Sequence, residues 1–202
     1  MARRLLPLLL VLATIAAAAP AADAGTRALT GQQRWVLRNI AQDEKLAHDV
    51  YARLGRRFSS LVVMRRIARI ESEHVAITVR VLRANGYANP VAGYAPGRFP
   101  WQRFVLAYGS WMQAGRVSPT AALAVGAHIE EEDIVDVRFA RRRSAGSPAM
   151  RRTMGILLRG SRNHLRRYVW ALRARGVDYL PLVLAQTEFD AIISSPLERT
   201  RD

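Results

Sequence analysis

Apolar residues recur every three or four positions over most of the chain beyond residue 31, a spacing typical of amphipathic helices. No stretch alternates apolar and polar residues as a half-buried strand would. We therefore predict an all-α protein with a single domain over residues 25–202. The expected helices cover residues 32–54, 59–85, 101–115, 119–142, 149–175 and 186–193.

Capping residues and helix breakers set these predicted boundaries. Gly55 is expected to end the first helix, and Ser59 with Ser60 is expected to cap the second. Ser118 followed by Pro119 predicts the start of the third main helix, because proline is tolerated in the first helical turn.

A long connection separates the second and third main helices. Residues 87–100 are rich in proline and glycine, and we interpret them as an ordered crossing loop that leads into the short helix over residues 101–115. Four main helices with one crossover between the second and third form the ferritin-like arrangement. The expected fold is therefore a ferritin-like four-helix bundle.

The first 24 residues have the pattern of a secretory signal peptide. A Met-Ala-Arg-Arg start precedes an apolar run over residues 5–19, and residues 22–24 (Ala-Asp-Ala) offer a small-x-small cleavage pattern. We predict cleavage after Ala24 and export to the periplasm or the cell exterior. A membrane anchor is the less favoured alternative, because the apolar run has about 15 residues where spanning needs roughly 20.

The amino-acid composition excludes several kinds of reactive site and favours anionic partners. The chain has no cysteine, which excludes disulfides, thiolate zinc sites, iron–sulfur clusters and cysteine nucleophiles. Its formal net charge is +15, carried almost wholly by arginine, since Lys45 is the single lysine. A cationic surface favours anionic partners, such as an anionic envelope surface, in a salt-dependent way. No nucleic-acid-binding motif accompanies the charge, so we expect no specific nucleic-acid binding.

Acidic residues are scarce and clustered. Only 16 occur in the chain, and five of them lie between residues 130 and 136. The apolar stripe of that helix places Glu130 on the inner face, with Asp133 one turn away. A shift of one residue in the helical phase would promote Glu131 instead of Glu130. A carboxylate on this face is expected to be buried or nearly so.

The other three main helices also place polar or ionisable groups on their inner stripes. These groups are Glu44, Glu71 with His74, and Ser161 with His164. An isolated buried carboxylate costs several kcal/mol, so such groups must pair with one another or bind a cation. A cluster of two metal ions satisfies all of them together, because di-iron and di-manganese bundles use Glu and Glu-x-x-His from facing helices.

Four stretches of the sequence carry a family resemblance. They are Asp-Glu-Lys-Leu-Ala at 43–47 with Asp-Val-Tyr at 49–51, Glu-Ser-Glu-His at 71–74, Gly-Ala-His-Ile-Glu-Glu-Glu-Asp-Ile at 126–134, and Arg-Gly-Ser-Arg-Asn-His-Leu at 159–165. In combination they resemble a bacterial ferritin-like domain family of unknown function, over residues 34–193.

The resemblance implies a bundle that binds two metal ions, most often iron with manganese as the alternative, and that carries out redox chemistry toward oxygen or peroxide. The metal ligands that it implies are Glu44, Glu71, His74, Glu130 and His164. Ser161 departs from the superfamily pattern, which usually supplies a carboxylate there. Either one metal position is weaker for this reason, or Asp133 fills in across the site.

The same pattern indicates secondary roles for several neighbouring polar residues. His48 is either an additional ligand or a rim residue, and His128 is expected at the surface. Asn163, next to His164 in the sequence, is a candidate partner that orients this imidazole as a ligand. Three further carboxylates are expected to pair with the abundant arginines: Glu73, Glu131 and Glu132.

Three functions are compatible with these patterns. The first is a di-metal oxidoreductase or ferroxidase-like protein of the bacterial envelope. The second is a non-catalytic protein that binds or buffers metal. The third is a metal-free, cationic helical module that docks on anionic polymers and whose inward polar groups pair with arginines. A homodimer is compatible with each of them.

Overall fold

The computed structural model describes residues 28–199. This part of the chain forms six α-helices: α1 (Gly31–Arg57), α2 (Val62–Ala84), α3 (Gln102–Gly115), α4 (Pro119–Arg142), α5 (Pro148–Arg173) and α6 (Gln186–Ser194). No strand occurs between residues 28 and 199, so the all-α prediction is confirmed for them. The predicted signal peptide, residues 1–24, lies outside the described residues.

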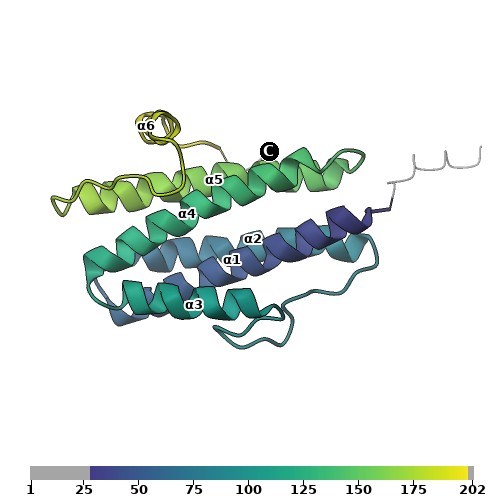
Figure 1. Ribbon diagram of the computed structural model, residues 1–202, viewed down its shortest axis with the longest axis horizontal. Helices are drawn as coiled ribbons and strands as arrows, with labels where there is room; N and C mark the ends of the chain where they lie inside the picture. The colour runs from purple at the N-terminus through teal and green to yellow at the C-terminus, as the bar shows by residue number, and fades with distance from the viewer. Residues whose placement is uncertain (1–27, 200–202) are drawn as a thin grey trace, which may run out of the picture.

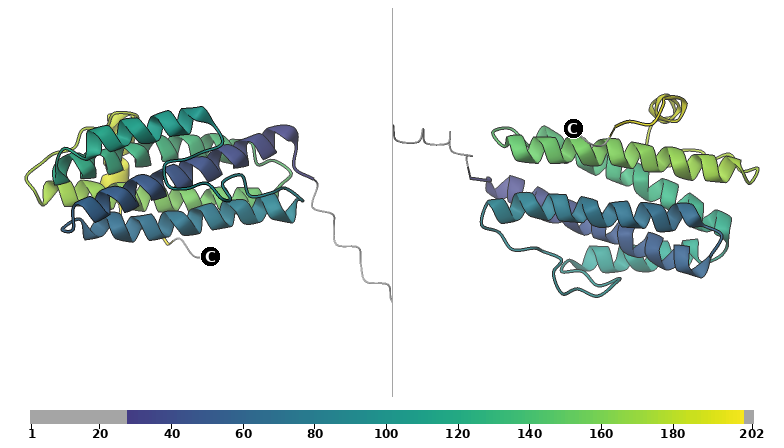
Figure 2. Two further views of the ribbon diagram at one scale, coloured as in Figure 1. Left: turned by 90° about the horizontal axis from the view of Figure 1, so that it is seen from below. Right: turned by 180° about the vertical axis from the view of Figure 1, so that it is seen from behind.

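The four longest helices, α1, α2, α4 and α5, run lengthwise beside one another as a bundle (Figure 1). α1 packs against α2 and α4, and α5 packs against α4 and α2, so the four helices enclose a common interior. α3 lies against α1 and α4 from outside, while α6 contacts α5 (Figure 2).

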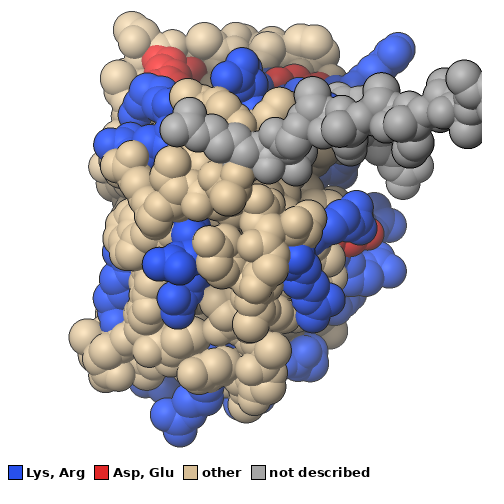
Figure 3. All heavy atoms as spheres, turned by 90° about the vertical axis from the view of Figure 1, so that its right-hand side faces the viewer, with Lys and Arg blue, Asp and Glu red and all other residues tan. Residues whose placement is uncertain are grey.

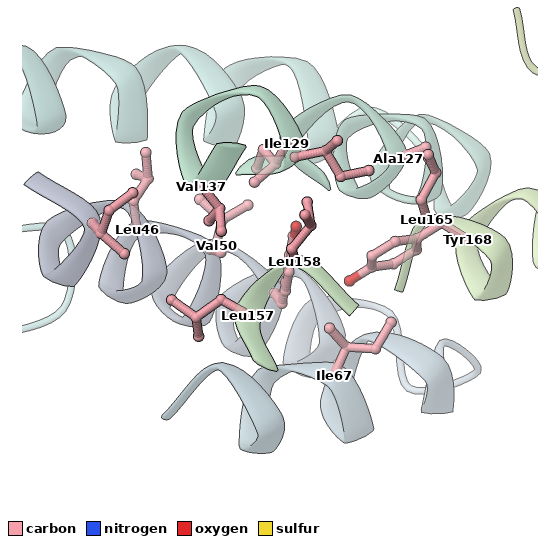
Figure 4. Close-up of a cluster of buried hydrophobic side chains, with 14 of the residues drawn as sticks. Leu46, Val50, Ile67, Ala127, Ile129, Val137, Leu157, Leu158, Leu165 and Tyr168 are labelled. Atoms are coloured by element: carbon pink, nitrogen blue, oxygen red, sulfur yellow. The ribbon is translucent and has the colours of Figure 1, made fainter. Parts of the chain in front are cut away.

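Apolar side chains from all four long helices fill this interior (Figure 4). They include Leu46, Val50, Ile67, Ala127, Ile129, Val137, Leu157, Leu158 and Leu165, each of them buried. Each fully buried valine, leucine or isoleucine side chain contributes about 1.5–3 kcal/mol to stability. The same interior also holds a set of polar side chains, which this apolar packing separates from bulk water.

The predicted N-terminal cap of α4 is confirmed. The Ser118 side chain accepts a hydrogen bond from the Ala121 backbone N–H at 3.0 Å, and Pro119 occupies the first helical position. α5 begins in the same way, with the Ser147 side chain accepting from the Met150 N–H ahead of a proline. These caps satisfy backbone donors that the first turn of a helix leaves unpaired.

The predicted end of α1 at Gly55 is wrong, because the helix continues to residue 57. Gly55 is buried where α2 approaches, and a Cβ atom there would lie 2.8 Å from Arg65 Cγ. The Arg65 guanidinium donates to the Gly55 carbonyl at 2.9 Å. The glycine therefore permits close approach of two helices rather than ending one.

The predicted cap of α2 at Ser59 and Ser60 is also wrong. The N-cap is Leu61, which makes no side-chain capping bond. The Ser59 carbonyl instead accepts from the Arg65 guanidinium at 2.7 Å, so this arginine organises the turn in place of a serine hydroxyl.

The connection from α2 to α4 crosses the outside of the bundle and includes α3 (Figure 2). Backbone groups of its first part bind side chains of α1. Lys45 Nζ donates to the Ala95 carbonyl at 3.1 Å, and the Gly97 N–H donates to Asp49 Oδ2 at 2.9 Å. Lys45 and Asp49 also form an ion pair with each other. The predicted ordered crossing loop is therefore observed.

A membrane-spanning helix would need a longer apolar run than any described helix contains. Between residues 28 and 199, no helix is both long and apolar enough to cross a membrane.

Candidate metal centre

Each of the four long helices contributes an ionisable side chain to the middle of the bundle. These side chains are Glu44 from α1, Glu71 and His74 from α2, Glu130 from α4, and His164 from α5. All five are at most 4% exposed to solvent. The structure thus brings together five of the six residues that the sequence suggested as metal ligands.

The first half of this cluster joins α1 and α2. His74 Nδ1 lies 2.8 Å from Glu71 Oε2 and 3.1 Å from Glu44 Oε2. Glu71 and His74 are three residues apart, so they share one face of α2 and both meet Glu44. Ligand atoms of the three residues all lie within 4.8 Å of one another, a grouping able to hold a metal ion.

The second half joins α2, α4 and α5. His164 Nδ1 lies 2.6 Å from Glu71 Oε1 and 3.5 Å from Glu130 Oε1, and these three residues form a second grouping within the same 4.8 Å limit. Glu71 belongs to both groups and offers one carboxylate oxygen to each. The two imidazole rings are stacked with their centroids 5.5 Å apart. The arrangement is therefore two three-residue groups with a shared carboxylate.

Several buried polar atoms of this cluster have no hydrogen-bond partner among the described residues. Within residues 28–199, no hydrogen-bond partner is found for Glu44 Oε1, Glu71 Oε1, Glu130 Oε2 or His164 Nδ1, although all four atoms are buried. His164 Nδ1 and Glu71 Oε1 nevertheless face each other as an ion pair at 2.6 Å, so the buried atoms of the cluster without any partner in this part of the chain are Glu44 Oε1 and Glu130 Oε2. Each unsatisfied buried group costs about 1–3 kcal/mol or more. One cation in each group would satisfy these atoms, and oxygen with imidazole donors suits iron, manganese or zinc.

Glu130 is held in place by Tyr51. The tyrosine hydroxyl donates to Glu130 Oε1 at 2.9 Å and lies 3.3 Å from the Gly126 carbonyl. The sequence left open whether Glu130 or Glu131 faces the interior of the cluster. The structure places Glu130 there.

Glu131 is equally buried, but it points away from the cluster to the segment between α5 and α6. It accepts from the Tyr179 hydroxyl at 2.6 Å and from the backbone N–H groups of residues 182–184 at 2.8–3.2 Å. The expectation that Glu131 pairs with arginine is corrected by this geometry. The partners lie about 50 residues along the chain, where no local pattern could reveal them.

Asp133 and Ser161 lie outside both three-residue groups. Asp133 is 5% exposed and is absent from the two groupings; burial, followed by the negative charges of Glu44 and Glu130, raises its pKa well above the usual value. The Ser161 hydroxyl donates to the Leu157 carbonyl of its own helix at 3.1 Å. Neither residue therefore supplies the additional carboxylate that the resemblance implied for α5.

The remaining polar candidates have partners elsewhere. His48 Nδ1 lies 2.7 Å from the Ala68 carbonyl, and the half-buried His128 packs edge-on against Trp111. Asn163 exchanges hydrogen bonds with the backbone of Glu198 and accepts from the Arg166 guanidinium, rather than contacting His164. It therefore anchors the C-terminal segment.

Burial and mutual interaction shift the acid–base equilibria of the cluster. Burial raises the pKa of Glu44 to about 8 and that of Glu130 to about 7. Burial opposes the charge on Glu71 too, but the two neighbouring histidines prevail and lower its pKa. The facing carboxylates outweigh burial at His164 and raise its pKa to about 9. In the metal-free protein, protons therefore neutralise the charges that a cation would otherwise neutralise.

The stability of the metal-free protein should fall as the pH rises. His164, Glu44 and Glu130 all bind protons more tightly in the folded chain than at their ordinary pKa values of 6.5 and 4.5. Folding therefore takes up protons over this range, and its free energy weakens between roughly pH 4.5 and 9. We expect Tm at pH 9 to lie at least about 5 °C below Tm at pH 6. Thermal melts in chelator test this, and an unchanged or higher Tm at pH 9 would contradict it.

Gly160 makes room for His74. A Cβ atom at position 160 would lie 2.5 Å from His74 Cε1 and 2.7 Å from Nε2, in a buried environment where the ring cannot move freely. The sequence reasoning missed this residue, although a glycine inside a helix next to polar inward residues is a usable signal.

Substituting Gly160 with alanine is expected to destabilise the protein by about 1–3 kcal/mol, as overpacking does, and to weaken metal binding through displacement of His74. Gly155→Ala on the same helix is the matched control, because its Cβ would meet only an Arg159 nitrogen at 3.6 Å. Urea unfolding and metal titration of both variants provide the measurement. Equal behaviour of the two variants would refute the role of Gly160.

Fold and site together define a class of protein, a helical bundle with a buried centre of carboxylates and histidines. Residues 32–196 match a family described as an uncharacterized protein domain, DUF2202, and the chain belongs to that family. The predicted membership of a family of unknown function is thereby confirmed.

The chain is similar to an archaeal protein over most of its length. The chain is 30% identical over 171 residues to uncharacterized protein MJ0754 of Methanocaldococcus jannaschii, covering 85% of this chain and 91% of the relative. It is also similar to the crystal structure of hypothetical protein MJ0754 from Methanococcus jannaschii DSM 2661. That likeness has a TM-score of 0.82 and 29% identity, and it covers 88% of this chain and 100% of the other.

Proposed function

We propose that this chain is a ferritin-like protein that binds two metal ions, preferably iron, and oxidises ferrous iron with oxygen or peroxide. The observation that carries the proposal is the position of Glu71. Its two carboxylate oxygens face different histidines, so one side chain connects two groups that are each able to hold an ion. Manganese is the alternative metal, because it accepts the same oxygen and imidazole ligands.

The order of the ligands along the chain supports a ferritin-like assignment. Glu on α1, Glu-x-x-His on α2, Glu on α4 and His on α5 follow the di-iron bundle pattern, and the long connection separates the second and third helices of the bundle. The departure is Ser161, which leaves the α5 contribution with a single imidazole. The second group therefore lacks the carboxylate that the di-iron pattern supplies from the fourth helix of the bundle.

Bound iron would supply the redox chemistry, in which two ferrous ions would give one electron each to O2, which with two protons would become hydrogen peroxide. Carboxylate ligands favour this reaction because they stabilise the higher charge of ferric iron. Glu44 and Glu130 would release their protons as the cations bind, since a ligand must be deprotonated. Tyr51 keeps Glu130 oriented through the hydrogen bond to Oε1.

The proposal includes export of the protein and contact with an anionic envelope surface. The Met-Ala-Arg-Arg start, the apolar run and the Ala-Asp-Ala pattern support export with cleavage after Ala24. The net charge of +15 supports contact with an anionic envelope surface. Fractionation of cells, with N-terminal sequencing of the mature chain, tests both the location and the cleavage position.

Iron oxidation and metal content test the function. The protein purified without chelator should contain about two ions per chain, one for each group, and it should oxidise ferrous iron faster than buffer does. Glu130→Gln should lose this acceleration, whereas Glu73→Gln, at an exposed position of α2, should retain it. Bound ions without acceleration would indicate a non-catalytic metal-binding protein. No ions and no thermal shift on adding iron or manganese would overturn the proposal and leave the interaction module.

A further inference from the structure

A pocket of about 720 Å³ lies between the C-terminal halves of α1 and α3. Most of the side chains that line it are arginines, and Tyr108 and Met112 of α3 complete its wall. The arginines are Arg53, Arg56, Arg57 and Arg116. We call this feature the arginine pocket.

The positive charge of the arginine pocket is not balanced by the chain itself. No acidic residue lines the pocket. Among residues 28–199, its four guanidinium groups also form no ion pair, whereas Arg138 and Arg162 each pair with a glutamate. Like charges around one cavity repel one another, and an anion that enters the cavity relieves this repulsion. The pocket is therefore suited to an anionic ligand.

Tyr108 is held at the wall of the pocket by the crossing loop. Gly97 has a φ of 74°, and a Cβ atom there would lie 2.5 Å from Tyr108 Cε1, so the loop backbone packs directly against the ring. Asp49, the carboxylate whose charge acts on Tyr108, pairs with Lys45 and accepts from the Gly97 N–H, so its charge is already balanced. The tyrosine hydroxyl has no hydrogen-bond partner in the described part of the chain and is a further donor for a ligand.

Arg57 is oriented before any ligand binds. Its Nε donates to the Arg116 carbonyl at 3.1 Å, and its guanidinium stacks over the Phe58 ring. Its two terminal nitrogens have no acceptor between residues 28 and 199, so they can both donate to a ligand. Gly115 allows α3 to approach α1 closely beside the pocket, because a Cβ atom there would lie 2.5 Å from Leu54 Cδ1. Groups that are held in place before binding lose less entropy when the ligand arrives.

The arginine pocket differs from the cationic surface in general. The formal net charge is +15, and on the opposite end of the bundle, where α1 begins, cationic side chains lie scattered among uncharged ones (Figure 3). The arginine pocket instead gathers its guanidinium groups around one cavity. A cleft lined by one sign of charge focuses the electric field, so it attracts a counter-ion more strongly than dispersed charges do.

The number and kind of these groups indicate the ligand. Guanidinium groups match the geometry of phosphate oxygens and donate to them in pairs. A phosphate group carries about −1.5 to −2 charges near neutral pH, so two phosphates balance four arginines. We propose that the arginine pocket binds a soluble compound with two linked phosphates, held by the four guanidinium groups and the Tyr108 hydroxyl. This site is separate from the metal centre and does not depend on the proposed function.

Calorimetric titration with inorganic pyrophosphate tests the proposal. The protein is first freed of metal with a chelator that is then removed, since pyrophosphate itself binds metal ions. The wild-type protein should bind about one equivalent. Arg53→Gln/Arg56→Gln should bind about a hundredfold more weakly, because each charge-assisted contact contributes roughly tenfold or more. Arg80→Gln/Arg83→Gln, at exposed positions of α2, is the matched control with the same net charge and should bind as wild type does.

Tyr108→Phe removes a single hydroxyl and should weaken pyrophosphate binding about threefold without changing the Tm of the free protein. This variant repeats the test should the double arginine variant fail to fold. No binding by the wild type, or equal weakening in both double variants, would overturn the site. Orthophosphate bound as tightly as pyrophosphate would overturn the assignment to two linked phosphates. Binding to phosphatidylglycerol vesicles but not to pyrophosphate would overturn the soluble ligand in favour of a lipid head group.

Discussion

Replacing Glu71 with glutamine is expected to abolish the binding of both metal ions, whereas Glu130→Gln should leave one ion bound. Glu71 offers one oxygen to each three-residue group, so an amide at this position weakens both groups at once. Glu130 belongs to the second group alone. Removal of the shared carboxylate of Glu71 should therefore release both ions, whereas removal of the Glu130 carboxylate should release one.

Metal content after dialysis, together with the thermal shift on adding Mn²⁺, measures this difference. Glu73→Gln is the matched control, because it makes the same chemical change two residues further along α2 at an exposed position. All three variants should be compared at the same pH, since ions and protons compete for these ligands. Retention of two ions by Glu71→Gln would show that the carboxylate is not shared.

Glu131→Ala is expected to lower the free energy of unfolding by about 3 kcal/mol or more, because it leaves several buried donors without an acceptor. The groups that would lose their partner are the Tyr179 hydroxyl and the N–H groups of residues 182–184. The segment between α5 and α6 would then detach from α4 first. Where the variant still folds, it should bind two ions, since Glu131 belongs to neither group.

Urea unfolding of Glu131→Ala and of Glu132→Ala measures this effect. Glu132 is the next residue on the same helix, and 48% of its side chain is exposed, so its loss should change stability little. A decrease below about 1 kcal/mol for Glu131→Ala would mean that water replaces the carboxylate easily. Loss of metal from a folded Glu131→Ala protein would reopen the assignment of Glu130 as the inward residue.

The fold class and the order of the helices were predictable because they depend on local periodicity. The cap at Ser118 could also be identified from sequence, because a serine followed by a proline is a local signal. Gly55 was assigned wrongly, because its role depends on Arg65 in the neighbouring helix rather than on the residues around it. Contacts between helices are not encoded in the spacing within one helix.

The candidate site was predictable to the same extent. Periodicity placed Glu44, Glu71 and Glu130 on inner faces, and the structure brings them together. Periodicity gives the direction of a side chain but neither its depth nor its partner, so it could not distinguish Asp133, which lies outside both groups, from the five residues that form them. Their role as metal ligands stays a prediction until metal binding is measured.

The contacts of α1 have a consequence for how the protein opens. One side of this helix supplies Glu44 to the centre, while Gln42, Lys45 and Asp49 bind the crossing loop on another side. The middle of α1 therefore cannot separate from either partner without disrupting both. Its amide hydrogens should exchange with solvent only when the whole domain unfolds. The middle of α1 therefore opens at the rate of global unfolding and not by local fraying.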